Sequence, residues 1–177
     1  MSQDELNTWM DDVNASKFTL VTSVKNGVVY KRPLRYSIVK IDHSAWLHFD
    51  SILTSDRLEE IRLWGAVRPD SIALNEFVRK WMAGELKTIR YMEISLKAAW
   101  GETETVFSEK YLREVMRGIE QPEGPGWYIE PFQRAKMHCF IRCLNDGKLA
   151  RLNLSEGKFE FRIEEDNMIR TDNNANY

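Results

Sequence analysis

The spacing of apolar residues at the start of the chain predicts a short helix followed by a strand. Four apolar residues recur at helical intervals and would form one buried face: Leu6, Trp9, Met10 and Val13. Ser2 and Glu5 have the spacing of a capping box, which marks a helix start. Over positions 17–24 apolar and polar residues alternate, which is typical of a strand, and a short return strand is expected over 28–30.

Three segments in the middle of the chain share one pattern, apolar-x-x-apolar-x-apolar. They cover residues 36–41, 58–63 and 89–94, so their starts lie 22 and 31 residues apart, and a weaker fourth match begins at Phe18. The pattern resembles the strand half of a leucine-rich repeat, whose period is about 20–29 residues. The spacing alone leaves two alternatives open, a repeat or three unrelated short strands.

Two helices are expected beyond the second of these segments. The helix over 71–83 has a full apolar stripe, with Asp70 or Ser71 as its N-cap and Gly84 at its C-terminal cap. The second helix is expected over 108–117, after the cap residue Ser108.

The last third of the chain reads as three strands, over 137–144, 148–154 and 158–164. Turn sequences of the Asn-Asp-Gly and Ser-Glu-Gly type separate them, and this order predicts an antiparallel meander. The expected fold class is therefore α/β, with leucine-rich-repeat-like strand-helix units followed by a C-terminal antiparallel β-meander. The polar end of the chain, 166–177, is expected to be disordered.

Composition narrows the classes of protein to which the chain can belong. Its 177 residues are 43% apolar and include 8 Phe, 6 Tyr and 6 Trp, enough for a sizeable core. The formal charge of −2 lacks the basic excess of most nucleic-acid binders, and no apolar run reaches the ~18 residues of a membrane span. The acidic start lacks the layout of a secretion signal, and two cysteines are too few for a disulfide framework. We therefore expect a cytoplasmic or nuclear protein that is not secreted and binds neither nucleic acid nor membrane.

A search for catalytic or metal-binding motifs yields no candidate. Cys139 and Cys143 are four residues apart on a strand, about 13 Å, which is too far for both to bind one metal ion, and a core role is expected for both. His43 could act as a base that Asp42 orients, but no nucleophile in the sequence can be paired with them. Phosphate-binding glycine motifs are absent from the sequence. We expect no catalytic residue, no metal ion and no cofactor.

The polar positions of the repeated pattern are the remaining candidates for function. In a repeat strand they point to the open side of the sheet, where Trp, Tyr and Arg among charges are typical of protein-binding hot spots. The candidate protein-binding face consists of these residues: Lys40, Asp42, Glu60, Arg62, Trp64, Tyr91 and Glu93. The alternative is that another element covers this side, which would place Trp64 and Tyr91 in the core.

Several blocks of the sequence resemble the nematode F-box-associated domain, type 2, over residues 50–165. The run Ile52–Leu63 is similar to the segment that opens that domain, and Met116–Ile119 and the strands around the Asp-Gly turn match in order. The most specific block is Leu-Asn-x-Phe-x-x-x-Trp-x-x-Gly over 74–84. The residues that carry the match are expected to be structural: Leu74, Asn75, Phe77, Trp81, Gly84, Asp146 and Gly147.

The resemblance implies a non-enzymatic module that recruits a protein client to a cullin-type ubiquitin ligase. Relatives of this kind carry an F-box that docks on the cullin adaptor, whereas residues 1–49 read as one helix and strand-like sequence. We therefore expect no F-box, which leaves a divergent, a truncated or a stand-alone recognition module as alternatives. The alternative is a flavin-binding split-barrel oxidoreductase of the pyridoxamine-phosphate-oxidase type, in which the segment Ser55–Arg57 could hold a phosphate.

Overall fold

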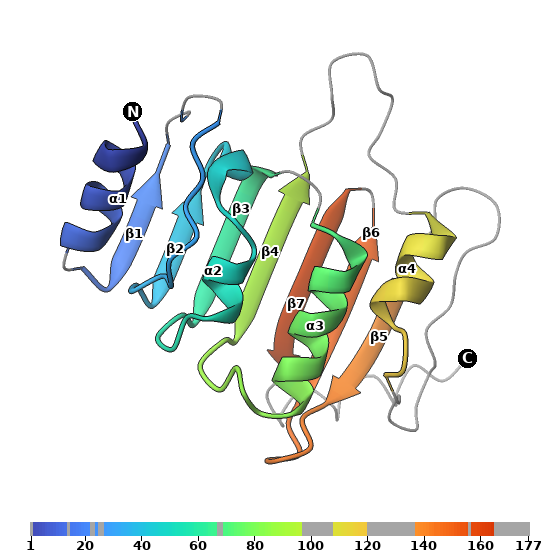
Figure 1. Cartoon of the computed structure of the whole chain (residues 1–177). Helices are drawn as coiled ribbons and strands as arrows, with labels where there is room; N and C mark the ends of the chain where they lie inside the picture. The colour runs from blue at the N-terminus through green and yellow to red at the C-terminus, as the bar shows by residue number, and fades with distance from the viewer. Residues whose placement is uncertain are drawn as a thin grey trace, which may run out of the picture.

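A computed structural model shows a mixed α/β fold built on one seven-stranded sheet (Figure 1). It describes residues 2–13, 15–21, 24, 27–66, 69–96, 108–119, 137–155 and 157–164. The strands are β1 (Lys17–Leu20), β2 (Ile38–Ile41), β3 (Glu60–Ala66), β4 (Tyr91–Leu96), β5 (Met137–Arg142), β6 (Leu149–Ser155) and β7 (Lys158–Glu164). The helices are α1 (Gln3–Asp12), the 3-10 turn η1 (Ser44–Trp46), α2 (Asp50–Leu53), α3 (Ser71–Met82) and α4 (Glu109–Val115).

The sheet has a parallel half and an antiparallel half that share one seam. Its strand order is β1-β2-β3-β4-β7-β6-β5, and β1 to β4 run parallel in chain order. β7 pairs antiparallel with β4 and continues into β6 and β5, which confirms the C-terminal meander. Strands from both sides of residue 50 thus belong to the same sheet, since β2 pairs with β3.

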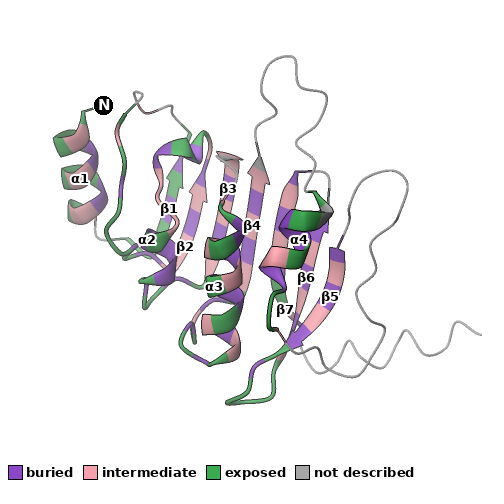
Figure 2. Ribbon diagram, turned by 45° about the vertical axis from the view of Figure 1, so that its right-hand side comes forward, coloured by how far each residue is buried: buried purple, intermediate pink, exposed green. Residues whose placement is uncertain are grey.

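The helices cover one face of the sheet, and the core lies between them and the strands (Figure 2). Alternate strand residues enter this core, such as Val39, Ile61, Met92 and Phe161. They join one continuous cluster that extends from Leu6 in α1 into β7. The opposite face of the sheet carries no described helix.

The three segments of the repeated pattern occupy equivalent positions in the structure. In each, the first apolar residue is buried just before the strand: Tyr36, Leu58 and Ile89. A carbonyl oxygen before each strand of the series accepts two consecutive N–H groups of the next segment. Ser16 O accepts from Ser37 and Ile38, Ser37 O from Glu59 and Glu60, and Glu59 O from Arg90 and Tyr91, all at 2.8–3.1 Å. As a consequence, β2, β3 and β4 start in register with one another. Each of them begins two residues after the first apolar residue of its pattern.

The start of the chain differs from the prediction in four respects, three of which concern α1 and β1. The capping box of α1 forms, and Leu6 and Met10 are buried, but Trp9 is 39% exposed, and its ring makes an edge-to-face contact with Phe18 at 5.4 Å between centroids. Phe18 pairs with Val39, the second apolar position of the pattern, so the fourth match is out of register by three residues. β1 is also shorter than expected.

The end of β2 explains why β1 stops at Leu20. After Ile41 the chain turns into η1 through His43, whose φ is 55°, and β1 loses its partner there. Val21 is accordingly 73% exposed. The expected strand over 28–30 is absent, and Tyr30 makes an isolated bridge to Leu47 instead.

Helix α3 packs its predicted stripe over the seam of the sheet. Asp70 caps its first turn by accepting from Ile72 N, and Trp81 is only 3% exposed. The rings of Phe77 and Trp81 meet Phe161 edge to face, at 5.2 and 5.1 Å between centroids. Such aromatic pairs add about 0.5–1.5 kcal/mol to the stabilisation from burial.

The residues that carry the family resemblance join α3 to its neighbours. Leu144 N donates to Met82 O (2.8 Å), and Asn145 Nδ2 donates to Ala83 O (2.7 Å), so the turn between β5 and β6 docks on the end of α3. Gly84 ends the helix with φ +73°, where a Cβ would strike the Asn145 side chain.

Two further motif residues complete these contacts. Asn75 Nδ2 donates to Val115 O (2.7 Å) and Arg117 O (3.1 Å), so it caps the end of α4. Asp146 accepts from Lys148 N in the β5–β6 turn, and hydrogen bonds from Lys148 and Cys143 lower the pKa of Asp146 to about 2. The run over 121–126, whose two prolines and two glycines predict a loop, lies outside the described residues, and so does the expected disordered tail over 166–177.

We predict that Trp81→Ala lowers the free energy of unfolding by about 3–5 kcal/mol, because it empties a large buried volume against Phe161. Ile72→Ala in the same helix is the control, since Ile72 is 71% exposed and a change within about 0.5 kcal/mol is expected there. Denaturant melts measure both. A loss below 1 kcal/mol for Trp81→Ala would contradict the packing described for α3.

We further predict that Gly84→Ala is more destabilising than Gly147→Ala, although both glycines have φ +73°. The left-handed backbone costs each alanine about 1–2 kcal/mol. Only Gly84→Ala also displaces Asn145 from Ala83 O, which adds about 1 kcal/mol, whereas the space around Gly147 is open. With Asn145→Ala as background, which leaves only the Cβ of that side chain near Gly84, the difference between the two substitutions should shrink in urea melts, and an unchanged difference would refute this explanation.

Candidate functional site

The face of the sheet opposite the helices is the candidate functional site. We call it the open face. Strand alternation directs Lys40, Glu60, Arg62, Tyr91 and Glu93 to it, because their neighbours in sequence enter the core. All five are half-buried rather than fully exposed.

A chain of polar contacts begins on β2 and crosses β3. Lys40 Nζ lies 3.7 Å from Glu60 Oε1, and Arg62 Nε donates to the same oxygen at 2.8 Å. The guanidinium of Arg62 lies 4.9 Å from the centre of the Tyr91 ring, a cation–π distance. These contacts connect the side chains of three neighbouring strands.

The chain continues across the seam into β7. Tyr91 Oη donates to Glu93 Oε2 at 2.6 Å, and Ser95 Oγ reaches Glu93 Oε1 at 3.5 Å. Lys158 Nζ lies 3.3 Å from Glu93 Oε2 and 3.6 Å from Glu160 Oε2. The network thus extends from β2 to β7, and its central carboxylate is Glu93.

The two central groups have shifted pKa values. Burial and the hydrogen bond to Glu93 raise the pKa of Tyr91, so its hydroxyl stays protonated and remains a donor. Burial alone would raise the pKa of Glu93, but hydrogen bonds from Tyr91 and Lys158 outweigh it and lower that pKa. The pair therefore holds a fixed donor and a fixed anion at neutral pH.

The structure also shows where the other two predicted residues lie. Trp64 is half-buried on β3 and pairs with Ser95 of β4. Asp42 lies one residue beyond the end of β2, and its side chain makes no hydrogen bond or ion pair among the described residues. Five of the seven predicted residues therefore share one network, with Trp64 in the same part of the sheet and Asp42 apart from it.

The meander adds charged residues to this face that the sequence analysis did not select. Arg151 donates to Glu164 Oε1 through Nε (2.6 Å), and Arg162 lies directly opposite Arg151 in the pairing of β6 with β7. Lys158 and Glu160 belong to the same group. The polar alternation in 158–164 was the available signal, but it does not reveal that β7 pairs with β4.

The more exposed of these ion pairs, such as Lys40 with Glu60, contribute little to stability, since exposed pairs are typically worth about 0–1 kcal/mol. The side chains of Glu93 and Glu164 are only 13% and 5% exposed. Their effect on binding is different. Shared partners hold the long side chains of Arg62 and Lys158 in place before any partner arrives, which reduces the entropy lost on association. The open face can therefore present an ordered surface of charge and aromatic rings.

The remaining chemical candidates are engaged elsewhere. Cys139 is buried, which raises the pKa of its thiol to about 12, and Cys143 is also buried and free. The Ser55 hydroxyl accepts from Leu34 N (2.8 Å) and donates to Ser51 O, so both of its bonding roles are filled.

Among the described residues, no group of three or more His, Cys, Asp or Glu side chains could hold a metal ion. Nor does that part of the chain contain a helix long and apolar enough to cross a membrane.

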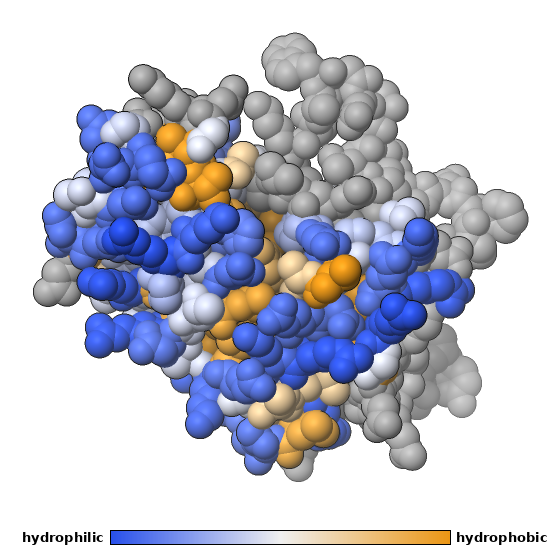
Figure 3. Space-filling view, viewed as in Figure 1, coloured by the Kyte–Doolittle hydropathy of each residue, from blue (hydrophilic) through white to orange (hydrophobic). Residues whose placement is uncertain are grey.

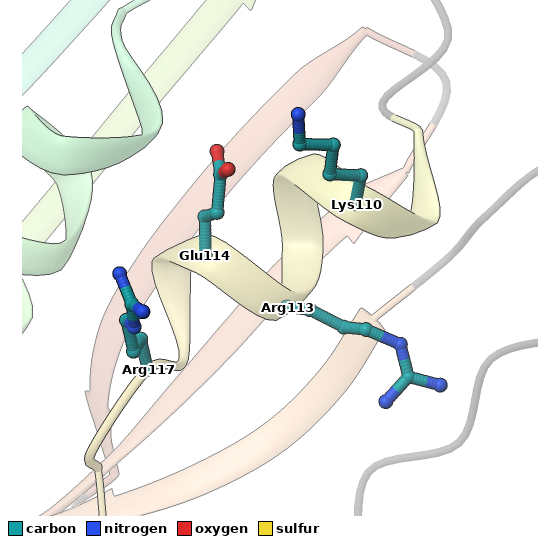
Figure 4. Close-up of a pocket in the computed structure, with 4 residues that line it drawn as sticks. All are labelled: Lys110, Arg113, Glu114 and Arg117. Atoms are coloured by element: carbon teal, nitrogen blue, oxygen red, sulfur yellow. The ribbon is translucent and has the colours of Figure 1, made fainter.

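A shallow hollow beside α4 is lined by charged residues (Figure 4). Glu114 and Arg117 point to the same side of the helix, and Arg113 points away. Glu114 Oε2 accepts from Ser71 Oγ at 2.7 Å, and Arg117 O accepts from Arg79 at 2.8 Å. Both contacts hold α4 against α3, so Glu114 and the Arg117 carbonyl have a structural role.

We predict that the stabilisation due to Glu93 disappears in acid. Its pKa is lower in the folded protein than in the unfolded chain, where a glutamate has a pKa of about 4.3. The stabilisation is therefore full above that value and is lost as the pH falls through the folded pKa. In urea melts, wild type should exceed Glu93→Gln in stability at pH 7, and the gap should close towards pH 3.

Tyr91→Phe serves as the matched variant, because it removes one of the hydrogen bonds that lower the pKa of Glu93. In this background Glu93→Gln should show a smaller gap at pH 7. A gap that does not change with pH would contradict the role assigned to the network.

Comparisons with protein-family models, with curated proteins and with solved structures found no match to this chain. The resemblance to the F-box-associated domain therefore stays a prediction that rests on the residues named for it.

Proposed function

We propose that the chain is a non-enzymatic protein-recognition module that binds its partner with the open face of the sheet. The observation that carries this proposal is the network from Lys40 to Glu160, which orders charged and aromatic side chains on a face without a described helix. Trp, Tyr and Arg are the residues most enriched at binding hot spots. Trp64, Tyr91 and Arg62 supply all three on two adjacent strands.

We further propose that the parallel half is a leucine-rich-repeat-like unit. Its strands follow one another in chain order, and the same two-donor carbonyl contact precedes β2, β3 and β4. Repeat proteins of this type use the surface of their stacked parallel strands for binding. The open face of β1–β4 is the corresponding surface here.

The finer role follows the family resemblance. We propose that the module recruits a protein client, as the resembling domain is thought to do in F-box proteins of cullin-type ubiquitin ligases. The motif residues Asn75 and Gly84 have a structural role, since they hold α3, α4 and the β5–β6 turn together. They support the likeness of the fold and do not bear on the choice of client. Client choice would then reside in the open-face residues, which are not part of the matching motif.

We predict that Trp64→Ala weakens partner binding about thirtyfold, as expected for a hot-spot residue, and changes the free energy of unfolding by less than about 1 kcal/mol. Tagged wild-type protein and the variant would be used to capture partners from a native lysate. Mass spectrometry would then quantify the proteins that depend on Trp64. Trp9→Ala is the matched control, because Trp9 is an exposed tryptophan on α1, on the other side of the sheet.

The results of this capture experiment distinguish the proposed function from its alternatives. Loss of partners with Trp64→Ala but not with Trp9→Ala supports the open face as the binding surface. A melt shifted as far as that of Trp81→Ala would place Trp64 in the core and remove the proposal. Cullin and its adaptor among the captured proteins would support ligase recruitment, and specific partners without them a stand-alone module. A yellow purified protein would favour the flavoprotein alternative.

A further inference from the structure

A pocket of about 410 Å³ lies on the helix side of the sheet, away from the open face. It is bounded by η1, α2 and the start of α3, and in Figure 3 apolar surface shows between the polar surfaces of α2 and α3. Leu63 and Ile94 line it from the sheet, and they are direct partners in the pairing of β3 with β4. Phe49 and Ile52 line it from the segment of α2. Its size falls in the range of small-molecule sites.

Among the described residues, the two carboxylates at this pocket have no lysine or arginine partner. Asp50 Oδ2 lies 3.2 Å from His48 Nδ1. Asp70 uses Oδ1 to accept from Ile72 N (3.2 Å) and Ser71 Oγ (3.4 Å), and no described residue donates to its second oxygen. No lysine or arginine is among the described residues that line the pocket.

The described residues that line the pocket have a negative charge balance. The N-terminus of α3 carries a partial positive charge of about half a unit, which offsets part of the charge of Asp70. Asp50 is not offset in this way, because α2 has only four residues. A bound cation would therefore gain from both carboxylates, and the ring of Phe49 could add a cation–π contact.

We propose that this pocket binds a small organic ammonium ion, with its apolar part against Leu63, Ile94 and Phe49 and its charge towards Asp50 and Asp70. The location agrees with the general preference of open α/β sheets for ligands near the carboxyl ends of parallel strands. This site is independent of the open face, so either proposal can fail without the other.

Phenethylamine, which is protonated at pH 7, is a suitable probe. Its neutral analogue 2-phenylethanol and its anionic analogue phenylacetate have a similar size. Binding would be followed by amide chemical shifts in NMR titrations of the full chain. We expect saturable binding of the amine with shifts centred on 44–52 and 69–73, and affinity about tenfold lower for the alcohol, which lacks the charge-assisted contact.

Substitutions test which groups are responsible. Asp50→Asn and Asp70→Asn should each weaken amine binding, and Asn at position 70 keeps the capping role because it is a good N-cap. Ala73→Leu should block the pocket, since Ala73 lines it. Glu76→Gln is the matched control, because Glu76 is an acidic residue of the same helix outside the lining.

The proposal predicts that only the variants that change the pocket lose affinity. Equal binding of amine and alcohol, or full affinity of the Asp50→Asn/Asp70→Asn double variant, would overturn it. So would the absence of saturable amine binding. Saturation by Nα-acetyl-lysine amide but not by phenethylamine would overturn the assignment to a small molecule in favour of a protein lysine.

Discussion

The pairing of β4 with β7 is the contact on which both faces of the molecule depend. It joins the parallel half to the meander, with Met92 opposite Phe161 and Ile94 opposite Phe159. On the helix side, Phe77 and Trp81 of α3 close over Phe161. On the other side, the same pairing brings Lys158 to Glu93. One seam therefore completes both the core and the proposed recognition surface.

The two faces are stabilised by different forces. The helix side is stabilised by burial of apolar and aromatic groups, which is the larger contribution. The open face is formed by polar groups that restrain one another through shared contacts, such as those of Glu60 with both Lys40 and Arg62. Because these side chains stand on strands that the core holds in register, the surface needs little reorganisation to bind.

The motif residues and the candidate binding residues have separate tasks. Asn75 and Gly84 act on the junction between α3, α4 and the β5–β6 turn, and none of their contacts reaches the open face. A module with this division can keep its frame while the strand residues that face outwards vary. The pocket proposed to bind an ammonium ion is a third region, bounded by segments that connect the parallel strands.

Local features were predictable from the sequence because they depend on neighbours in the chain. The capping box of α1, the stripe of α3, the turns of the meander and the alternation of β2–β4 all follow from periodicity and local hydrogen bonding. The same alternation correctly placed Arg62 and Tyr91 on the polar face.

What periodicity does not contain is the identity of the neighbouring strand. Only the tertiary structure decided four features: the exposure of Trp9, the early end of β1, the ion pair of Glu93 with Lys158 and the pocket beside α2. Each of them depends on segments that are far apart in sequence and meet across the sheet.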